Sequence, residues 1–252
     1  MQLINALRYS QPSSLALVGA GGKTTAILTA ARELLTATSI EHAPKTVLIT
    51  TTTHFGAWQS VYADHFFTIN SLSDIAELNK DFPIGVVLLT GERKNNLLGG
   101  LHPRLLEKVR AIAVDRCLPL LIEADGSYTC PLKAPAEHEP AIPDFTQIAV
   151  VVAGLQGLGK PLTKTWVHRP EKFAELSELH MGEIVTGNAL VKVLLNREGG
   201  LKNIPSEARR IVLLNQADTP ELQSIAKTFS EKLIPDYHSC LLYTSPSPRD
   251  CS

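Results

Sequence analysis

The feature that most constrains this chain is the alternation of short, continuously apolar runs with segments of helical periodicity. The apolar runs include Thr46–Thr51 (TVLITT), Gly85–Thr90 (GVVLLT) and Gln147–Ala153 (QIAVVVA). A strand that is apolar on both faces has to be covered on both faces, which is typical of a parallel sheet whose connections are helices. Because such crossovers are right-handed, the expected fold is α/β: a doubly wound, mainly parallel sheet of the P-loop NTPase-like type, with helices on both faces.

The expected elements follow the same alternation. Strands are expected at Ser14–Val18, Thr46–Thr51, His65–Asn70, Gly85–Thr90, Pro119–Ile122, Gln147–Ala153 and Ile211–Leu214. Helices are expected at Thr24–Thr36, Ser73–Lys80, Pro103–Asp115, Pro170–Leu179, Asn188–Asn196 and Pro220–Leu233. The pattern stops after a helix, where one more strand would complete it, so we expect an edge strand to be missing.

Charge and cysteine content exclude several classes of protein. The 252 residues carry 24 Lys and Arg against 25 Asp and Glu, which leaves no basic surface for nucleic acid or an acidic membrane. The chain begins without a charged segment followed by a long apolar run, and a cytoplasmic location is therefore expected. Only Cys117 and Cys130 lie before residue 240, which provides neither a disulfide framework nor a zinc site.

The segment Cys240–Ser252 (CLLYTSPSPRDCS) differs in character from the rest of the chain. Its first residues, Cys240–Asp250, are one translation of a DNA sequence that resembles a transposase adapter used in sequencing libraries. We therefore interpret residues 240–252 as a non-native tail, expected to be disordered, on a single domain of residues 1–239 that is truncated at its C-terminus. The alternative is a natural terminus rich in Ser and Pro.

The strongest chemical signal is the glycine-rich segment Val18–Thr25 (VGAGGKTT), between a predicted strand and a predicted helix. Such a loop turns its N–H groups around phosphate oxygens at a helix N-terminus. The candidate nucleotide-binding residues are Gly19, Ala20, Gly21, Gly22, Lys23, Thr24 and Thr25. We expect a solvent-facing Lys23 to reach the outer phosphates as a catalytic residue, and Thr24 to bind Mg²⁺.

This segment departs from the strict P-loop motif, which has a glycine where Leu17 stands. Its spacing is similar to that of Mur-type ligases and metallocentre-assembly NTPases. The alternative interpretation is a tight turn from strand to helix that carries a surface lysine.

Two further motifs follow predicted strands, at the sheet edge where doubly wound folds bind ligands. Leu121–Ser127 (LIEADGS) has the form of a Walker B segment, in which Glu123 and Asp125 would hold Mg²⁺ and Asp125 would also be catalytic. Thr51–His54 (TTTH) offers hydroxyls and the candidate catalytic His54, which could position water or a metal. The alternatives are an Asp-Gly turn and a solvated histidine.

The segment Asn215–Asp218 (NQAD) follows the last predicted strand. It resembles the Asn-Lys-x-Asp motif of guanine recognition, so Asn215 and Asp218 are candidate base-binding residues. Gln216 stands where that motif has lysine, which leaves ATP and GTP both open. The alternative is a plain turn into a helix that Asp218 or Thr219 caps.

The middle of the chain supplies a candidate acceptor site. A stiff proline-rich segment, Cys130–Pro143, and the glycine turn Gly154–Pro161 both follow strands, and Val167–Glu171 opens a helix. The candidate substrate-binding residues are Lys133, His138, Lys160, His168 and Arg169. We expect these cations to gather around the phosphate end of the nucleotide. The alternative is a rigid lid with solvated charges.

Read in order, GAGGKTT, TTTH, EADGS, PLKAPAEHEPAIP, GLQGLGKPL, VHRPE and LNQAD resemble the YqeC-like accessory proteins of selenium-dependent hydroxylases. The resemblance covers Leu15 to Asp218. It implies a P-loop nucleotide-binding protein, a Mg²⁺-dependent NTPase that assists maturation of selenium-dependent molybdenum hydroxylases, with such a hydroxylase or its cofactor as partner. Two alternatives stay open: a Mur-ligase-like or kinase-like enzyme that activates a small anionic substrate with ATP, and a nucleotide-regulated metallocofactor chaperone.

Overall fold

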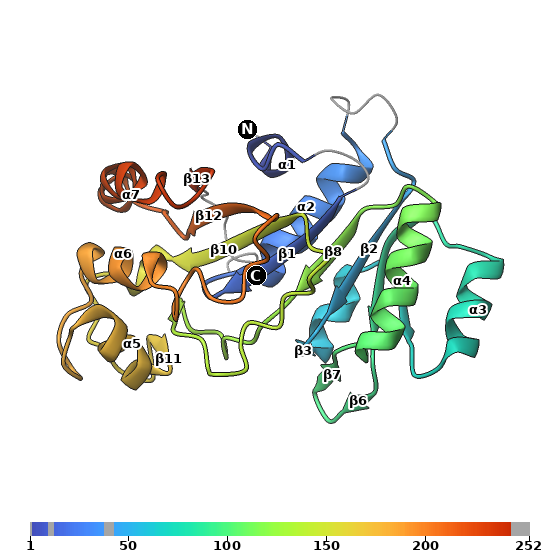
Figure 1. Ribbon diagram of the computed structural model, residues 1–252, viewed down its shortest axis with the longest axis horizontal. Coiled ribbons are helices and arrows are strands. Elements are labelled where there is room, and N and C mark those ends of the chain that lie inside the picture. The colour runs from blue at the N-terminus through green and yellow to red at the C-terminus, as the bar shows by residue number, and fades with distance from the viewer. Residues whose placement is uncertain (1, 10–12, 38–42, 243–252) are drawn as a thin grey trace.

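The computed structural model describes residues 2–9, 13–37 and 43–242 and is built around one parallel sheet (Figure 1). The eight strands lie in the order β13-β12-β10-β1-β8-β2-β5-β4, and all neighbours pair in parallel. Their bounds are β1 Ser14–Gly19, β2 Thr46–Thr51, β4 His65–Thr68, β5 Gly85–Thr90, β8 Leu120–Glu123, β10 Ile148–Gly154, β12 Arg209–Asn215 and β13 Ser239–Leu242. The predicted parallel sheet is confirmed.

Helices cover both faces of this sheet, as a doubly wound fold requires. They are α1 Leu3–Ala6, α2 Lys23–Leu35, α3 Leu72–Lys80, α4 Pro103–Asp115, α5 Pro170–Ser177, α6 Gly187–Leu195 and α7 Pro220–Leu233, with the 3₁₀ turns η1 Ala57–Tyr62 and η2 Leu155–Gly157. Helices α1 and α2 pack on one face, and the other five pack on the opposite face. Among the described helices, none has the length and apolar character needed to cross a membrane.

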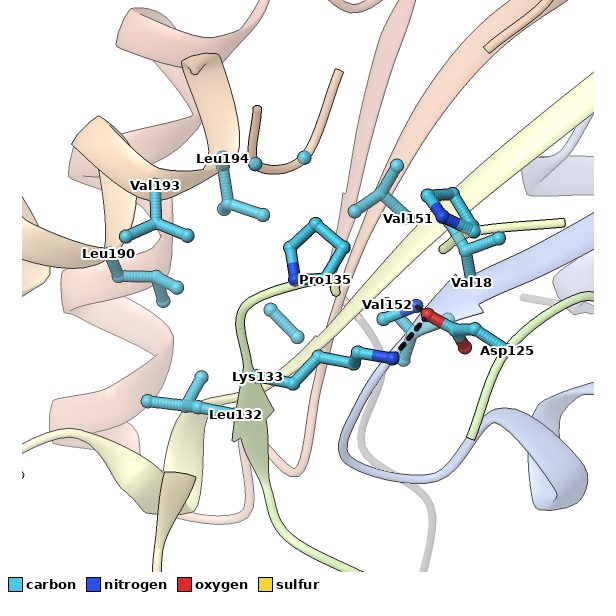
Figure 2. A pocket seen from close by; sticks show the side chains of 15 residues that line it. Val18, Asp125, Leu132, Lys133, Pro135, Val151, Val152, Leu190, Val193 and Leu194 are labelled. Atoms are coloured by element: carbon cyan, nitrogen blue, oxygen red, sulfur yellow. Dashed lines mark hydrogen bonds and ion pairs between the residues drawn. The ribbon is translucent and has the colours of Figure 1, made fainter. Parts of the chain in front are cut away.

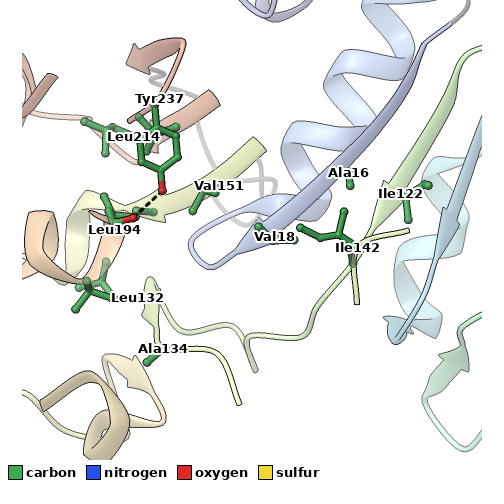
Figure 3. Close-up of a cluster of buried hydrophobic side chains, with 14 of the residues drawn as sticks. Ala16, Val18, Ile122, Leu132, Ala134, Ile142, Val151, Leu194, Leu214 and Tyr237 are labelled. Carbon is green, nitrogen blue, oxygen red and sulfur yellow. Dashed lines mark hydrogen bonds between the residues drawn. The ribbon is translucent and has the colours of Figure 1, made fainter. Parts of the chain in front are cut away.

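The core consists of two apolar layers, one on each face of the sheet. Successive residues of β1 alternate between them: Ala16 and Val18 enter the layer under α4 to α7, and Leu15 and Leu17 enter the layer under α1 and α2. Figure 3 shows Val18 in the first of these layers. Burial on both faces explains why the strands are continuously apolar in the sequence.

Two small sheets lie beside the main one, and neither was expected. Strands β3 (His54–Gly56), β7 (Leu97–Gly99) and β6 (Arg93–Lys94) form an antiparallel sheet, and β9 (Leu132–Lys133) pairs with β11 (Val167–His168) in parallel. Strands of two or three residues are too short to show a period in the sequence. The β9–β11 pair ties the proline-rich segment to the start of α5, and both carry charged residues of the site.

The C-terminal edge of the sheet corrects one expectation. We expected the edge strand after α7 to be missing, and the chain from Cys240 onwards to stay out of the fold. Instead, β13 pairs with residues Ile211 to Leu214 of β12, so the three residues Cys240 to Leu242 complete the sheet. Residues 243–252 lie outside the described residues, and their non-native origin stays a prediction.

Candidate functional site

The glycine-rich loop leaves the carboxyl end of β1, at the centre of the sheet, and leads into α2. Gly19 and Gly21 have φ values of +94° and +80°, in the left-handed region that favours glycine. A Cβ on Gly21 would lie 2.4 Å from the Cα of Gly154, and one on Gly19 would lie 2.1 Å from the carbonyl oxygen of Val152. The loop therefore packs against β10 so closely that larger residues would displace it.

Helix α2 begins at Lys23 without a side-chain cap. Its N-cap is Gly22, which has no side chain to accept a hydrogen bond, and φ there is +109°. The first N–H groups of a helix find no acceptor within the helix, and together with the helix dipole they form an anion-binding end. In the loop before the helix, the N–H groups of Ala20 and Gly21 donate to the carbonyls of Val152 and Cys130, at 2.9 and 3.1 Å. These two hydrogen bonds fix the loop in place.

Lys23 is buried, with 3% of its surface exposed, and this corrects the expectation of a solvent-facing lysine. Its Nζ donates to the carbonyl oxygen of Gly19 at 2.8 Å. The same Nζ lies 3.2 Å from Oδ1 of Asp125 and 4.0 Å from Oε1 of Glu123. Two buried carboxylates attract the ammonium group inwards, because a buried charge needs a partner.

The two carboxylates come from the neighbouring strand, as the Walker B interpretation expected. Strand β8 pairs with β1, which places Glu123 beside Leu17 and next to the start of α2. Oε2 of Glu123 accepts a hydrogen bond from the Thr24 hydroxyl at 2.8 Å, and Oδ2 of Asp125 accepts one from the Gly19 N–H at 2.9 Å. Burial raises the pKa of Glu123, and the nearby charge of Lys23 opposes this rise.

These contacts bring together the three residues predicted to bind Mg²⁺. A hydroxyl and two carboxylates suit this ion, which takes oxygen ligands and keeps several waters. Across the described residues there is no ready-made group of three or more His, Cys, Asp or Glu of metal-binding arrangement. A metal ion here would therefore depend on Thr24 and on oxygens from outside the protein, such as phosphate and water.

Lys133 is the second buried lysine of the site, and it comes from the proline-rich segment. Its Nζ lies 2.9 Å from Oδ2 of Asp125 and 2.7 Å from Oε2 of Glu139, and donates to the carbonyl of Gly126 at 2.6 Å. Figure 2 shows Lys133 and Asp125 pointing toward each other. Asp125 is thus held between two lysines.

The network continues from Glu139 to Arg169, the residue before α5. Both carboxylate oxygens of Glu139 accept from the guanidinium, Oε2 from Nη1 at 2.7 Å and Oε1 from Nη2 at 3.1 Å. Burial alone would raise the pKa of Glu139, but the hydrogen bonds and charges of Lys133 and Arg169 outweigh it and lower the pKa to about 2. The central position of Glu139 was missed, although a glutamate six residues after Lys133 in a stiff segment was a signal for it.

The five cations predicted to gather at the phosphate end do not all do so. Lys133 and Arg169 belong to the network above, where Asp125 and Glu139 pair with their charges. His168 lies beside them: burial first, and then the charges of Arg169 and Lys133, lower its pKa to about 4. His138 is exposed, and Lys160 is exposed with its Nζ 4.9 Å from the centre of the Trp166 ring. The expected acceptor site is therefore reduced to three residues.

The threonines of the TTTH motif support the site through the backbone. The Thr51 hydroxyl donates to the carbonyl of Glu123 at 2.9 Å, and the Thr52 hydroxyl donates to that of Ala141 at 2.8 Å. They connect β2 to the tip of β8 and to the proline-rich segment. His54 is exposed on β3, which pairs with β7 in the small antiparallel sheet, and its predicted catalytic role gains no contact from this position.

The NQAD segment follows β12 and contacts the glycine-rich loop from the other side. Asn215 is buried, and its Nδ2 donates to the carbonyl of Gly21 at 2.7 Å. The side chain that was predicted to bind the base therefore holds the loop. Asp218 is exposed, and its Oδ2 accepts from Nε2 of Gln156 at 3.1 Å. Of the two candidate base-binding residues, only Asp218 is exposed.

Behind the loop lies a small cavity of about 30 Å³. Gly19, Asp125 and Lys133 line its polar end, and Leu190 and Leu194 of α6 line its apolar end (Figure 2). A cavity of this size has room for water but not for a nucleotide. Phosphates would have to approach the loop from its outer side, at the start of α2.

Comparisons with known proteins agree with the motifs that form this site. A family model described as "YqeC protein" matches residues 15–171, which include the glycine-rich loop, Glu123, Asp125 and Arg169. The chain belongs to the YqeC family. It is also 32% identical over 206 residues to the "Uncharacterized protein YqeC" of Escherichia coli (strain K12), across 82% of this chain and 77% of that protein. No solved structure matches the chain significantly.

Proposed function

We propose that this member of the YqeC family binds a nucleoside triphosphate at the start of α2 and hydrolyses or transfers its terminal phosphate with the help of Mg²⁺. The observation that carries the proposal is the uncapped N-terminus of α2, with Lys23 and Thr24 in its first turn and two buried carboxylates beside them. A polyphosphate is the ligand that such a helix end and lysine bind best.

The charges of the site support this function. Without a ligand, Lys23 neutralises Asp125 and Glu123. With a triphosphate on the helix end, Lys23 would turn toward the phosphate oxygens. Glu123 would then lose its nearest cation, and Asp125 would keep Lys133 but lose one of its two lysines. Mg²⁺ supplies the positive charge that the carboxylates then lack and polarises the terminal phosphate. Thr24, Glu123 and Asp125 would hold it.

The proposal is tested by titrating the protein with ATP and with GTP, with and without Mg²⁺, in a calorimeter. The variant Thr24→Val keeps the side-chain shape but removes the hydroxyl that meets Glu123. We expect it to lose about tenfold in Mg²⁺-dependent affinity while the Mg²⁺-free affinity is unchanged. Thr228→Val, at an exposed position on α7, is the matched control. A folded wild-type protein that binds neither nucleotide overturns the proposal.

We further propose that the nucleotide cycle assists the maturation of a selenium-dependent molybdenum hydroxylase, which is the partner. Support comes from membership of the family, whose model matches residues 15–171. The experiment measures phosphate release with and without an immature hydroxylase of this class. We expect release to accelerate when the hydroxylase is added. An unchanged rate, together with acceleration by a small acceptor molecule, would favour a kinase or ligase instead.

A further inference from the structure

A groove of about 490 Å³ runs along the outer side of α2, next to the site described above. Its lining side chains come from α2 on one side and from η1 on the other. They include Thr24, Leu28 and Thr29 on α2 and Trp58, Val61 and Tyr62 on η1. This volume lies within the range of small-molecule pockets. Thr24 belongs both to this groove and to the candidate Mg²⁺ site, so the groove opens at the reacting end of the proposed nucleotide.

The wall that η1 contributes is unusually apolar for an exposed surface. Trp58 is 54% exposed, Val61 76% and Tyr62 40%. The rings of Trp58 and Tyr62 lie edge to face, with centroids 6.2 Å apart. Neighbouring large apolar side chains in a concave surface indicate a binding site, because their exposure to water is unfavourable. An indole side chain that is half exposed can offer a stacking surface for a flat ring.

The charged side chains along the groove already have polar partners. The guanidinium of Arg32 lies 2.6 Å from Oδ2 of Asp64 and also donates to the carbonyl of Tyr62. Oε2 of Glu33 accepts from the N–H of Ile4 at 2.9 Å. An anionic ligand at this end would meet only the guanidinium of Arg32, which Asp64 already neutralises. The polar groups that remain at the α2 side are the hydroxyls of Thr25 and Thr29.

We propose that this groove binds the planar, uncharged ring of a small-molecule substrate, stacked on Trp58, with the part of the molecule that reacts at the Thr24 end. The inference rests on the proposed nucleotide-dependent function, because it assigns the second substrate of the same site. It differs from the cationic acceptor site expected from Lys133, His138, Lys160, His168 and Arg169, of which Lys160 and His138 lie outside the buried charge network and Lys133 and Arg169 are paired with Asp125 and Glu139. The substrate class changes accordingly, from a small anion to an uncharged aromatic or heteroaromatic compound.

Ligand binding in the groove can be followed through Trp58, because the chain has one other tryptophan, Trp166, which can be replaced. A Trp166→Phe protein labelled with 5-fluorotryptophan gives one ¹⁹F resonance, from position 58. The probe is caffeine, a flat uncharged ring compound, and cyclohexanol is the non-planar control. We expect caffeine to shift the resonance saturably, and cyclohexanol to produce no saturable shift.

Two matched variants locate the binding. Thr29→Phe fills the groove from the α2 side, and Thr228→Phe makes the same change on the exposed face of α7. We expect Thr29→Phe to weaken caffeine binding at least about tenfold, and Thr228→Phe to leave it unchanged. Calorimetry with Mg²⁺ and a non-hydrolysable ATP analogue should give the same nucleotide affinity for both variants.

Other results overturn either the inference or the nucleotide function on which it rests. No saturable shift with caffeine, or an equal one with cyclohexanol, means that the groove does not select flat rings. If the ATP analogue alone shifts the Trp58 resonance and Thr29→Phe removes nucleotide binding, the groove holds the nucleotide's own base. Caffeine binding in a protein that binds no nucleotide would support the groove and contradict only the proposed nucleotide function.

Discussion

Lys23 is a buried ammonium group whose partners come from two neighbouring strands. Removing it leaves Glu123 buried without its nearest cation, and leaves Asp125 with Lys133 as its ion-pair partner. We therefore expect Lys23→Met to lower the free energy of unfolding by about 3 kcal/mol, in addition to abolishing nucleotide binding. Urea unfolding of the ligand-free protein measures this. A loss below about 1 kcal/mol would mean that Lys133, and not Lys23, supplies most of the charge that stabilises the buried carboxylates.

Asp125 is the residue at which the buried charges meet. The variant Asp125→Asn keeps the shape of the side chain but removes the charge between Lys23 and Lys133. We expect hydrolysis to require at least about tenfold more Mg²⁺, because one of the two carboxylate ligands is lost. Phosphate release is measured against Mg²⁺ concentration, with Asp115→Asn at the exposed end of α4 as the control. An unchanged Mg²⁺ dependence would exclude Asp125 as a ligand.

At the scale of elements, β12 contributes to the site through a single side chain. Asn215 at its end donates to the carbonyl of Gly21, so it can affect nucleotide binding without touching the base. We expect Asn215→Ala to weaken ATP and GTP binding by the same factor, about tenfold, since a buried hydrogen bond is lost and the loop loosens. Calorimetric titrations with both nucleotides check this. A changed ratio of the two affinities would instead indicate that Asn215 reads the base.

The elements that the sequence predicts best are those whose signal is local. Strands such as Gly85–Thr90 are continuously apolar, and the helix Pro103–Asp115 starts with proline, so their bounds agree with the structure. The glycine-rich loop and the LIEADGS strand were placed correctly because their spacing is specific and a parallel sheet brings strand ends together. Strands β9 and β11 could not be predicted, since two residues carry no period.

The pairing of the charged side chains could not be predicted from the sequence, for a different reason. Lys133 and Arg169 look like free cations when read along the chain, but Asp125 and Glu139 neutralise them in the folded protein. Whether a lysine faces solvent or a buried carboxylate depends on which segments pack together. The same holds for Lys23, whose burial follows from the neighbouring position of β8.

Across the whole molecule, the buried network joins segments that are distant along the chain. Positive and negative side chains alternate from the start of α2, through the tip of β8 and the proline-rich segment, to the start of α5. Each buried charge in the network is stable because it has a partner of opposite sign. Removing one member would leave its partner buried without that counter-charge. A ligand that displaces Lys23 would therefore disturb the contacts as far as Arg169.

The pH dependence of stability follows from two residues at the far end of this network. The pKa of His168 is lowered from 6.5 to about 4, so the folded protein favours the neutral ring. This contribution is complete above pH 6.5 and is lost as the pH falls toward 4. The pKa of Glu139 is lowered from 4.5 to about 2, so its contribution is complete above pH 4.5 and is lost as the pH falls toward 2. In both ranges the unfolded chain binds more protons, and stability falls with falling pH.

We expect His168→Gln to reduce this slope between pH 6.5 and pH 4, and the effect is free of Glu139 above pH 4.5. In this range the unfolded chain binds a proton at His168 that the folded protein does not bind. Such a proton changes the free energy of unfolding by at most about 1.4 kcal/mol per pH unit, and glutamine cannot bind it. Urea unfolding at several pH values measures the two curves, with His138→Gln at an exposed position of the proline-rich segment as the control. The control curve should follow the wild type throughout. Parallel curves for wild type and His168→Gln in this range would show that His168 is protonated as readily in the folded protein as in the unfolded chain.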